Sequence, residues 1–513
     1  MNIKKNFNQN VFFKYCNFFL IFLSGFFLIP FYLNFFSLEL FGSWIVVSAF
    51  TSWLLFFDPG SSNLIIQQIS RNIGKKSFNK IDSIIISGLI NTFILSLLIF
   101  FIGINLVDPL LNWAIKSSSK ILQIETAFRY SILSISIMLV VSSLIAILEG
   151  FQKMIIIGII VLSSTVIKII SVILFIKLNF GIKALPLSDI ISSINSLIIC
   201  LIVISSNLNL YIKKIQLRLT DYVNYTSLYL YNFTSRFTKI LGGGGLDSIF
   251  IGKFIGLESV SLFHLTQTLP KKFESFLSII SLAGRPALSF LSGKLDKKNF
   301  AYIKLKLIYF ILIAFTFMIF LFYDTIDPFV KLWINKDITI GSNIILLIVI
   351  FVSLRLLTNT LNLIIFSTGK IKQISKIQML YALFLLPSLF IGINFFDIEG
   401  LLTAHIIVLF FILTIYLSIL IFKNLYLIKN YKKKLISELF YLMMTFFISS
   451  MISLFIFKFF NFEPYNWIKL FLFIIIKITL FMSILFTLSK EFRSEIIYLY
   501  KKRKIKPLNK FVI

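Results

Sequence analysis

Residues 341–366 read GSNIILLIVIFVSLRLLTNTLNLIIF, and they contain a single charged side chain, that of Arg355. A helix needs about 20 mostly apolar residues to cross the ~30 Å hydrocarbon core of a bilayer, so this stretch is long enough to span a membrane. Similar runs recur along the whole chain of 513 residues, of which 58% are hydrophobic and 14% charged. Soluble proteins have roughly 45–50% apolar and about 25% charged residues. The sequence therefore predicts an all-α, polytopic membrane protein and excludes a soluble enzyme, a secreted disulfide scaffold and a disordered chain.

The apolar runs divide into about fourteen predicted membrane-spanning helices. They cover residues 11–36, 40–69, 81–106, 128–149, 155–177, 184–205, 223–250, 258–282, 302–323, 341–366, 376–396, 400–422, 438–457 and 467–489. The part from 223 to 282 is the least regular, because four glycines, Gly242 to Gly245, interrupt it. The longest predicted outer loop, 107–127, is too short to fold as a domain. We therefore expect the function to reside among the helices.

Lys and Arg are distributed unevenly between the two sides of these spans. With the N-terminus inside, most of the 50 Lys and Arg lie in or beside inner loops, such as the one with Lys297 and Lys298 and the tail from Lys501 to Lys504. Positively charged loops remain in the cytoplasm. We therefore expect both termini to be cytoplasmic and interpret the net charge of +29 as a topology signal, not as a nucleic-acid surface. Because no cleavage site follows the first span, we expect that span to be retained as an anchor.

The two halves of the chain share residues at one constant offset. The matched positions are Leu38-Glu39 with Leu257-Glu258, Gly74 with Gly293, Asp108-Pro109 with Asp327-Pro328, Gly150 with Gly369, and Gly181 with Gly400. Six predicted spans separate equivalent points, so the two repeats have the same orientation in the membrane. Such parallel repeats are related by an axis along the membrane normal, and transporters of this kind bind substrate near the midplane between the repeats.

The repeat predicts how the chain is divided. We expect a six-helix bundle over residues 1–210, a second six-helix bundle over 211–425, two extra helices over 426–489, and a basic cytoplasmic tail over 490–513. Two bundles that meet at a cleft can alternate access to a site between them. The fold predicted is thus a pair of parallel-repeat bundles with two C-terminal helices.

Several charged residues fall near the middle of predicted spans, where each costs at least ~2.5–3.5 kcal/mol unless it faces a cavity or a partner. The cations are Lys168, Arg236, Lys239, Lys271, Lys272 and Arg355, with Lys477 at a similar depth in the last span; the acids are Asp58, Asp189, Asp247 and Glu274. We predict that the first six cations line the lumen and bind substrate, and that Asp58, Asp247 and Glu274 act in ion coupling or gating. Two alternatives stay open: Lys271 can pair with Glu274, and Arg355 with Glu274 or Asp247.

An excess of positive charge in a water-filled lumen favours an anionic substrate. Arginine binds phosphate through two parallel hydrogen bonds, whereas lysine supplies a point charge. A diphosphate headgroup that carries a sugar chain fits such a lumen, while its lipid tail stays in the bilayer. An exporter of cationic drugs would need acids at these depths instead.

Degenerate motifs in both halves resemble one transporter family. They are Pro30, Leu38 to Trp44, Asp58-Pro59-Gly60, Glu149 to Lys153, Gly252 to Gly256, and Arg285 to Ser289. Together they resemble the polysaccharide and O-antigen flippases of the multidrug/oligosaccharidyl-lipid/polysaccharide (MOP) exporter superfamily, over nearly the whole chain.

The resemblance implies a protein of the bacterial inner membrane that moves undecaprenyl-diphosphate-linked oligosaccharide from the cytoplasmic to the outer leaflet. It implies no cofactor, coupling to a proton or sodium gradient in some members, and work beside a polysaccharide polymerase and a chain-length regulator. Three other functions remain open: a lipid II flippase, a small-molecule exporter of the same fold, and a membrane polysaccharide polymerase. Polymerase chemistry would normally need a substantial outer loop with acid, base or metal-binding groups, which the short loops do not offer.

Overall fold

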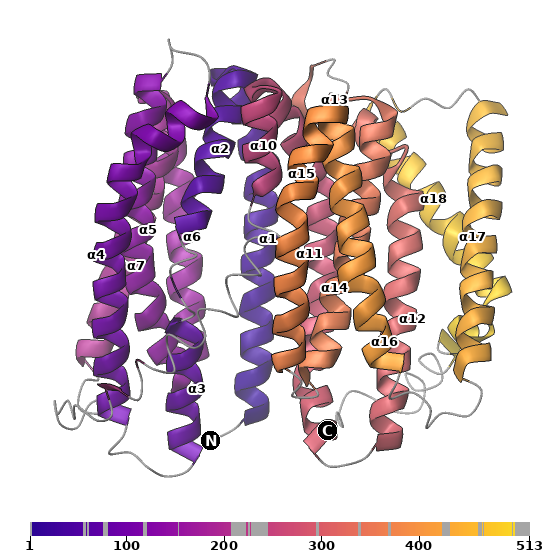
Figure 1. Ribbon diagram of the computed structural model, residues 1–513, viewed down its shortest axis with the longest axis horizontal. Helices are drawn as coiled ribbons and strands as arrows, with labels where there is room; N and C mark the ends of the chain where they lie inside the picture. Colours follow the sequence, from indigo (N-terminus) through magenta and orange to yellow (C-terminus); the bar gives the residue numbers. More distant parts are fainter. Residues whose placement is uncertain are drawn as a thin grey trace. The chain divides into compact units, whose positions relative to one another are not determined.

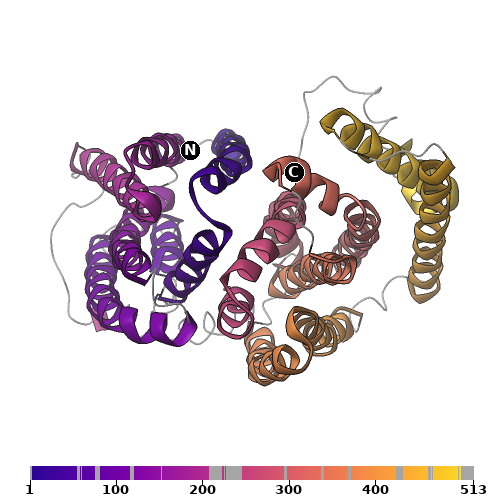
Figure 2. The same cartoon turned by 90° about the horizontal axis from the view of Figure 1, so that it is seen from above.

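The protein is described by a computed structural model, and every element that it describes is a helix (Figure 1). The described residues are 3–54, 58, 61–74, 81–115, 121–151, 153–206, 222–223, 226, 245–293, 297–336, 340–367, 371–422, 431–459, 464, 466–494 and 496–497. By their contacts they form two compact units, Met1–His264 and Leu265–Ile513. Seen from above, most helices of the first unit are viewed nearly end-on, as in a bundle (Figure 2).

The first unit contains α1 (Ile3–Phe35), α2 (Leu38–Leu54), α3 (Ser61–Gly74), α4 (Ile81–Ala114), α5 (Ile121–Gly150), α6 (Met154–Lys177), the short η3 (Gly181–Lys183), α7 (Ala184–Ser206), α10 (Leu246–Phe254) and the first turns of α11 (Leu257–Gly293). The second unit contains the rest of α11, then α12 (Lys297–Phe322), α13 (Ile326–Ile334), α14 (Ser342–Ser367), α15 (Ile371–Val408), the π-helical η4 (Leu409–Ile415), α16 (Tyr416–Phe422), α17 (Tyr431–Phe459) and α18 (Trp467–Leu488).

The prediction of a polytopic, all-α membrane protein is confirmed. Ten of the described helices are long and apolar enough to cross a membrane. One of these, Lys376–Ile419, covers the predicted spans 376–396 and 400–422 together. Of the remaining predicted spans, 40–69 corresponds to α2 and α3 and 258–282 lies within α11, whereas 223–250 falls mostly outside the described residues.

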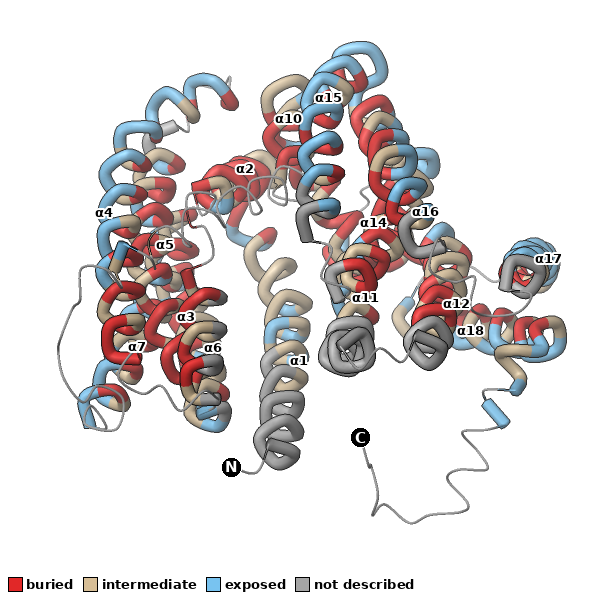
Figure 3. Tube along the Cα trace, turned by 60° about the horizontal axis from the view of Figure 1, so that its bottom comes forward, coloured by how far each residue is buried: buried red, intermediate tan, exposed pale blue. Residues whose placement is uncertain are grey.

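The polarity of the helix faces is that of a protein in lipid. On α4 the exposed face carries large apolar side chains such as Phe93 and Phe101, whereas Asn91, Thr92 and Ser96 are buried (Figure 3). The Ser96 hydroxyl donates to the Ser136 carbonyl of α5, at 2.8 Å. Small and hydroxyl-bearing residues allow close packing of helices in a membrane, where apolar side chains gain nothing by facing one another instead of lipid.

The repeat seen in the sequence recurs in the helix boundaries. α2 begins at Leu38 and α11 begins at Leu257, and each has a glutamate, Glu39 or Glu258, in its first turn. α3 ends at Gly74, and α11 ends at the equivalent Gly293. The two compact units nevertheless divide inside α11 and not near residue 210, and α10 packs against α2 within the first unit. The predicted division into bundles therefore stays a prediction.

A tight turn inside α15 replaces the predicted loop at residues 397–399. Asp397 has a positive φ of 49°, so the chain reverses there between two helical arms. Gly392 and Gly400 lie against each other, since a Cβ on either would collide with the carbonyl of the other. Farther from the turn, the Tyr381 hydroxyl and His405 Nε2 share a buried hydrogen bond of 2.8 Å between the arms.

Candidate functional site

A buried ion pair joins α11 and α14 in the second unit. Arg355 Nη2 lies 3.4 Å from Glu274 Oε2, and Asn359 Nδ2 donates to Glu274 Oε1 at 3.2 Å. Arg355 and Asn359 are four residues apart on α14, so both reach the same carboxylate. At ~1.5 Å per residue, Arg355 lies some 20 Å from the start of α14, which places the pair deep among the helices. This is one of the three pairings left open by the sequence.

The ion pair leaves part of the Arg355 guanidinium available. Its side chain is 27% exposed, whereas that of Glu274 is 6% exposed. A guanidinium group has five N–H donors, and the Glu274 carboxylate contacts it at Nη2. Arg355 can therefore hold Glu274 and still donate to a second anion. Its predicted contact with substrate stays a prediction.

Lys271 and Lys272 lie one turn before Glu274 on α11, and both are half-buried. Successive residues point about 100° apart on a helix, so the two ammonium groups leave α11 in different directions. At this level α11 and α14 together carry three cations, Lys271, Lys272 and Arg355, and one carboxylate, Glu274. The net charge of this pair of helices is therefore positive in the middle of their length.

Lys168 of α6 forms an ion pair with Asp189 of α7 in the first unit. Both side chains are partly exposed, at 45% and 33%. A polar contact continues along the same two helices: the hydroxyls of Ser164 and Ser196 are 2.6 Å apart, and Asn195 Nδ2 donates to Ser164 Oγ at 3.0 Å. Lys168 was predicted as a lumen cation, and the structure gives it a carboxylate partner.

The other two predicted acids lie at helix starts. Asp58 is buried, and its carboxylate accepts from the backbone N–H of Ser61, so it caps the N-terminus of α3. Such capping contributes about 1 kcal/mol to a helix. Asp247 lies in the first turn of α10, two residues after Gly245, whose φ is 84°. Arg236 and Lys239 fall outside the described residues.

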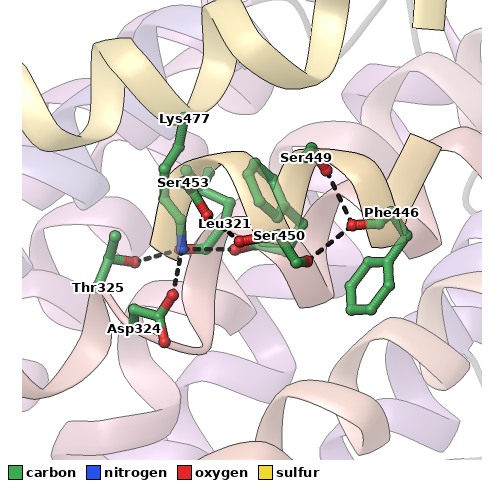
Figure 4. Close-up of polar contacts among 9 residues, drawn as sticks. Leu321, Asp324, Thr325, Phe446, Ser449, Ser450, Ser453 and Lys477 are labelled. Carbon is green, nitrogen blue, oxygen red and sulfur yellow. Dashed lines mark hydrogen bonds and ion pairs between the residues drawn. The ribbon is translucent and has the colours of Figure 1, made fainter. Parts of the chain in front are cut away.

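Lys477 has the most buried ammonium group among these cations, and the sequence named no partner for it. Its side chain is 0% exposed; Nζ lies 2.6 Å from Asp324 Oδ2 and donates to the Phe320 carbonyl at 2.8 Å. Figure 4 shows the side chain reaching from α18 to Asp324, which lies in the turn that follows α12. Nζ also lies 4.8 Å from the centre of the Phe320 ring, which adds a cation–π contact. This contact attaches the C-terminal helix pair to α12.

Comparison with known proteins identifies the fold. No protein family and no curated protein matches the sequence. A lipid II flippase, MurJ, in an inward closed conformation matches with a TM-score of 0.66 and 18% identity, over 95% of this chain and 100% of that one. An inward-facing multidrug transporter of the MATE family matches with a TM-score of 0.64 and 12% identity, over 83% of this chain and 96% of that one. A MOP superfamily transporter from Pyrococcus furiosus, whose binding pocket is described as having reversed polarity, matches with a TM-score of 0.54 and 13% identity, over 82% and 96%. The chain therefore has the fold of the MOP superfamily transporters.

Proposed function

We propose that this protein is a flippase that moves undecaprenyl-diphosphate-linked oligosaccharide, a repeat unit of O-antigen or another surface polysaccharide, across the bacterial inner membrane. It works by alternating access through a cationic lumen between its two repeats. Both termini lie in the cytoplasm, and the substrate is delivered to the outer leaflet. It is a transporter and not an enzyme, since the work consists of binding and reorienting an intact lipid.

One observation carries the proposal: the excess of positive charge at the middle of α11 and α14. Among the described residues of these two helices, Lys271, Lys272 and Arg355 lie there with one carboxylate, that of Glu274, which contacts Arg355 and Asn359. A diphosphate brings two phosphate groups and adds negative charge beside these cations. Bidentate Arg–phosphate contacts are short and charge-assisted, and they are strengthened where water is scarce.

The comparisons favour a lipid-linked substrate over a soluble drug. The lipid II flippase covers 95% of this chain, whereas the MATE multidrug transporter covers 83%. The match to the flippase thus extends over more of this chain than the match to the multidrug transporter does. A cationic drug would also be repelled by Lys271, Lys272 and Arg355.

Transport of lipid II itself is the second candidate, and the same match supports it. Both candidates carry a diphosphate on a long lipid, so the charges on α11 and α14 do not distinguish them. Uptake of cationic compounds into vesicles would instead identify a drug exporter. Formation of longer glycan chains, when purified protein is mixed with lipid-linked repeat units, would identify a polysaccharide polymerase.

Deletion of the gene tests the proposal in cells. We expect surface polysaccharide to be lost and lipid-linked repeat units to accumulate in the inner leaflet, while cell-wall synthesis continues. Complementation with the Lys271→Gln/Lys272→Gln variant should restore little export, whereas Lys458→Gln, an exposed lysine in the last turn of α17, should restore it fully. Arrest of wall synthesis on deletion would instead identify a lipid II flippase.

A further inference from the structure

One predicted span of the second unit is interrupted by a short segment of π-helix. α15 ends at Val408, the next seven residues, Leu409–Ile415, form the π-helical η4, and α16 begins at Tyr416. Val408 and Tyr416 both have α-helical backbone angles, so the change in hydrogen bonding is confined to η4. The sequence has no proline or glycine between residues 401 and 422 that would distort the helix. π-helical turns are rare, and they occur frequently at functional sites.

A threonine hydroxyl bond inside η4 belongs to the π-helical geometry. Thr414 is buried, and its Oγ1 donates to the Leu409 carbonyl, five residues earlier, at 3.2 Å. In an α-helix a threonine hydroxyl reaches a carbonyl three or four residues earlier, as Thr445 of α17 does with Tyr441. The bond between Thr414 and Leu409 therefore stabilises the π-helical form of this segment and is lost when the segment becomes α-helical.

The equivalent segment of the first repeat is α-helical. At the offset that matches Gly181 with Gly400, η4 corresponds to residues 190–196, which lie within the α-helix α7. The repeat can therefore be built with an ordinary α-helix at this place. Because a π-helical hydrogen bond spans one residue more than an α-helical one, the π-helical turn of the second repeat is equivalent to one residue inserted into an α-helix.

η4 lies at the same depth as Arg355 and Asn359 of α14. The ring centroids of Phe351 on α14 and His405 on α15 are 4.4 Å apart, and α14 also contacts η4 and α16. One predicted span lies between α14 and this arm of α15, so the two cross the membrane in the same direction. Counting along both helices from these rings, at ~1.5 Å per residue, brings η4 level with Arg355 and Asn359. The π-helical turn therefore packs beside the ion pair with Glu274.

We propose that η4 is a hinge of the transporter, at which α16 changes its register against α14 between the states of the transport cycle. The proposal rests on the proposed alternating-access function. Conversion of the π-helical turn to α-helix rotates α16 by about one residue, ~100°, and shifts it by ~1.5 Å along its axis relative to α15. A ligand that binds Arg355 more tightly in one register favours that register, so binding at this depth changes the predicted cytoplasmic end of the span.

Two single-residue deletions test the hinge. Phe411 is an exposed residue of η4, and Phe384 is an exposed residue in the α-helical first arm of α15. Deletion of Phe411 brings the buried Leu409 and Leu413 from four residues apart to three, and either spacing keeps both side chains on one face of an α-helix. α15 and α16 then join as one α-helix. Deletion of Phe384 instead rotates the two halves of an α-helical arm by ~100° against each other and misaligns their buried faces.

We expect the Phe411 deletion variant to reach the membrane in wild-type amount and to unfold at or above the wild-type temperature, whereas the Phe384 deletion variant should be several-fold less abundant. In vesicles at equal protein content, the Phe411 deletion should reduce transfer of a fluorescent undecaprenyl-diphosphate oligosaccharide several-fold. Transfer at the wild-type rate by this variant overturns the hinge, and so does a loss of abundance as large as that caused by deletion of Phe384. Failure of the wild-type protein itself to transfer the glycolipid refutes the proposed function.

A fluorine label gives a readout that needs no transport. Tyr416→Cys and Ile407→Cys place a thiol at exposed positions just after and just before η4, each in a Cys16→Ser/Cys200→Ala background, and the thiol is modified with a trifluoromethyl reagent. In fluorine NMR we expect two resonances from the label at 416, with populations that added undecaprenyl diphosphate changes, and one from the label at 407.

Two threonine variants connect these resonances to η4. Thr414→Val should shift the label at 416 towards the single resonance expected of the Phe411 deletion variant, because the bond to the Leu409 carbonyl is lost. Thr445→Val is the matched control, a buried threonine bonded within α17, and should leave both resonances. A single resonance at 416 in the otherwise wild-type protein, with and without undecaprenyl diphosphate, overturns the hinge. Two resonances that undecaprenyl diphosphate leaves unchanged, together with no transfer by the wild type, retain the hinge and refute the proposed function.

Discussion

Replacement of Arg355 by methionine should destabilise the protein more than neutralisation of its partner Glu274. Arg355→Met leaves a carboxylate that is 6% exposed and still accepts a hydrogen bond from Asn359. Glu274→Gln instead leaves a guanidinium that is 27% exposed and can reach water. A buried unpaired charge costs more than a partly hydrated one. The order of stability should therefore be wild type, then Glu274→Gln, then Arg355→Met.

The magnitude follows from the geometry of the pair. At 3.4 Å, two unit charges attract by about 5 kcal/mol at an effective dielectric constant of about 20. Desolvation of both groups opposes this attraction, and loss of one partner of a buried pair typically costs about 3–5 kcal/mol. We expect Arg355→Met to lie in that range and Glu274→Gln below it. The double variant Arg355→Met/Glu274→Gln should be close to wild type, because it leaves no unpaired charge.

The differences in stability between these variants are measured by thermal unfolding in detergent. The abundance of each variant in the membrane is measured alongside. Lys458→Met is the control for loss of a cation at an exposed position. The double variant is decisive: if it is as unstable as Arg355→Met, the two residues are not coupled and the ion pair is not what holds α11 to α14. A stable double variant that still fails to export glycolipid would separate the substrate role of Arg355 from its structural role.

Three further outcomes follow from the fold. Lys477→Met should loosen the C-terminal helix pair and lower the unfolding temperature, because the bonds of Nζ to α12 are lost; an unchanged unfolding temperature would contradict this. Gly392→Ala should reduce membrane abundance, since its methyl group meets the Gly400 carbonyl. Normal abundance would show that the two helical arms of α15 can move apart without loss of the fold. Cysteines at Lys297 and Asn335 should label from opposite sides of the membrane, and labelling of both from outside would overturn the topology.

The sequence determined where the helices lie along the chain but not which faces meet. The repeat placed Leu38 and Leu257 at equivalent positions, and both turned out to begin helices. This succeeded because helix starts depend on local residues. The turn at Asp397 was also anticipated, as a short loop, although the Gly392–Gly400 contact that closes it was not.

The charged site was predicted less completely. Depth along a helix is readable from sequence, so Arg355, Lys168 and Lys477 were all recognised as deep. Their partners depend on helix rotation and on which helices are neighbours. The sequence leaves Glu274 as a partner for either Lys271 or Arg355, and it does not indicate Asp324, in the turn after α12, as the partner of Lys477. Pairing with Glu274, Asp189 and Asp324 reduces the excess positive charge expected from the sequence.

Reconstitution of the purified protein in vesicles tests the central claim most directly. Fluorescent undecaprenyl-diphosphate oligosaccharide is placed in one leaflet, and its arrival in the other is followed with a membrane-impermeant quencher. We predict transfer by the wild type and by Lys458→Gln, and strongly reduced transfer by Lys271→Gln/Lys272→Gln at equal protein content. Equal transfer by empty vesicles and by vesicles with wild-type protein would contradict the account.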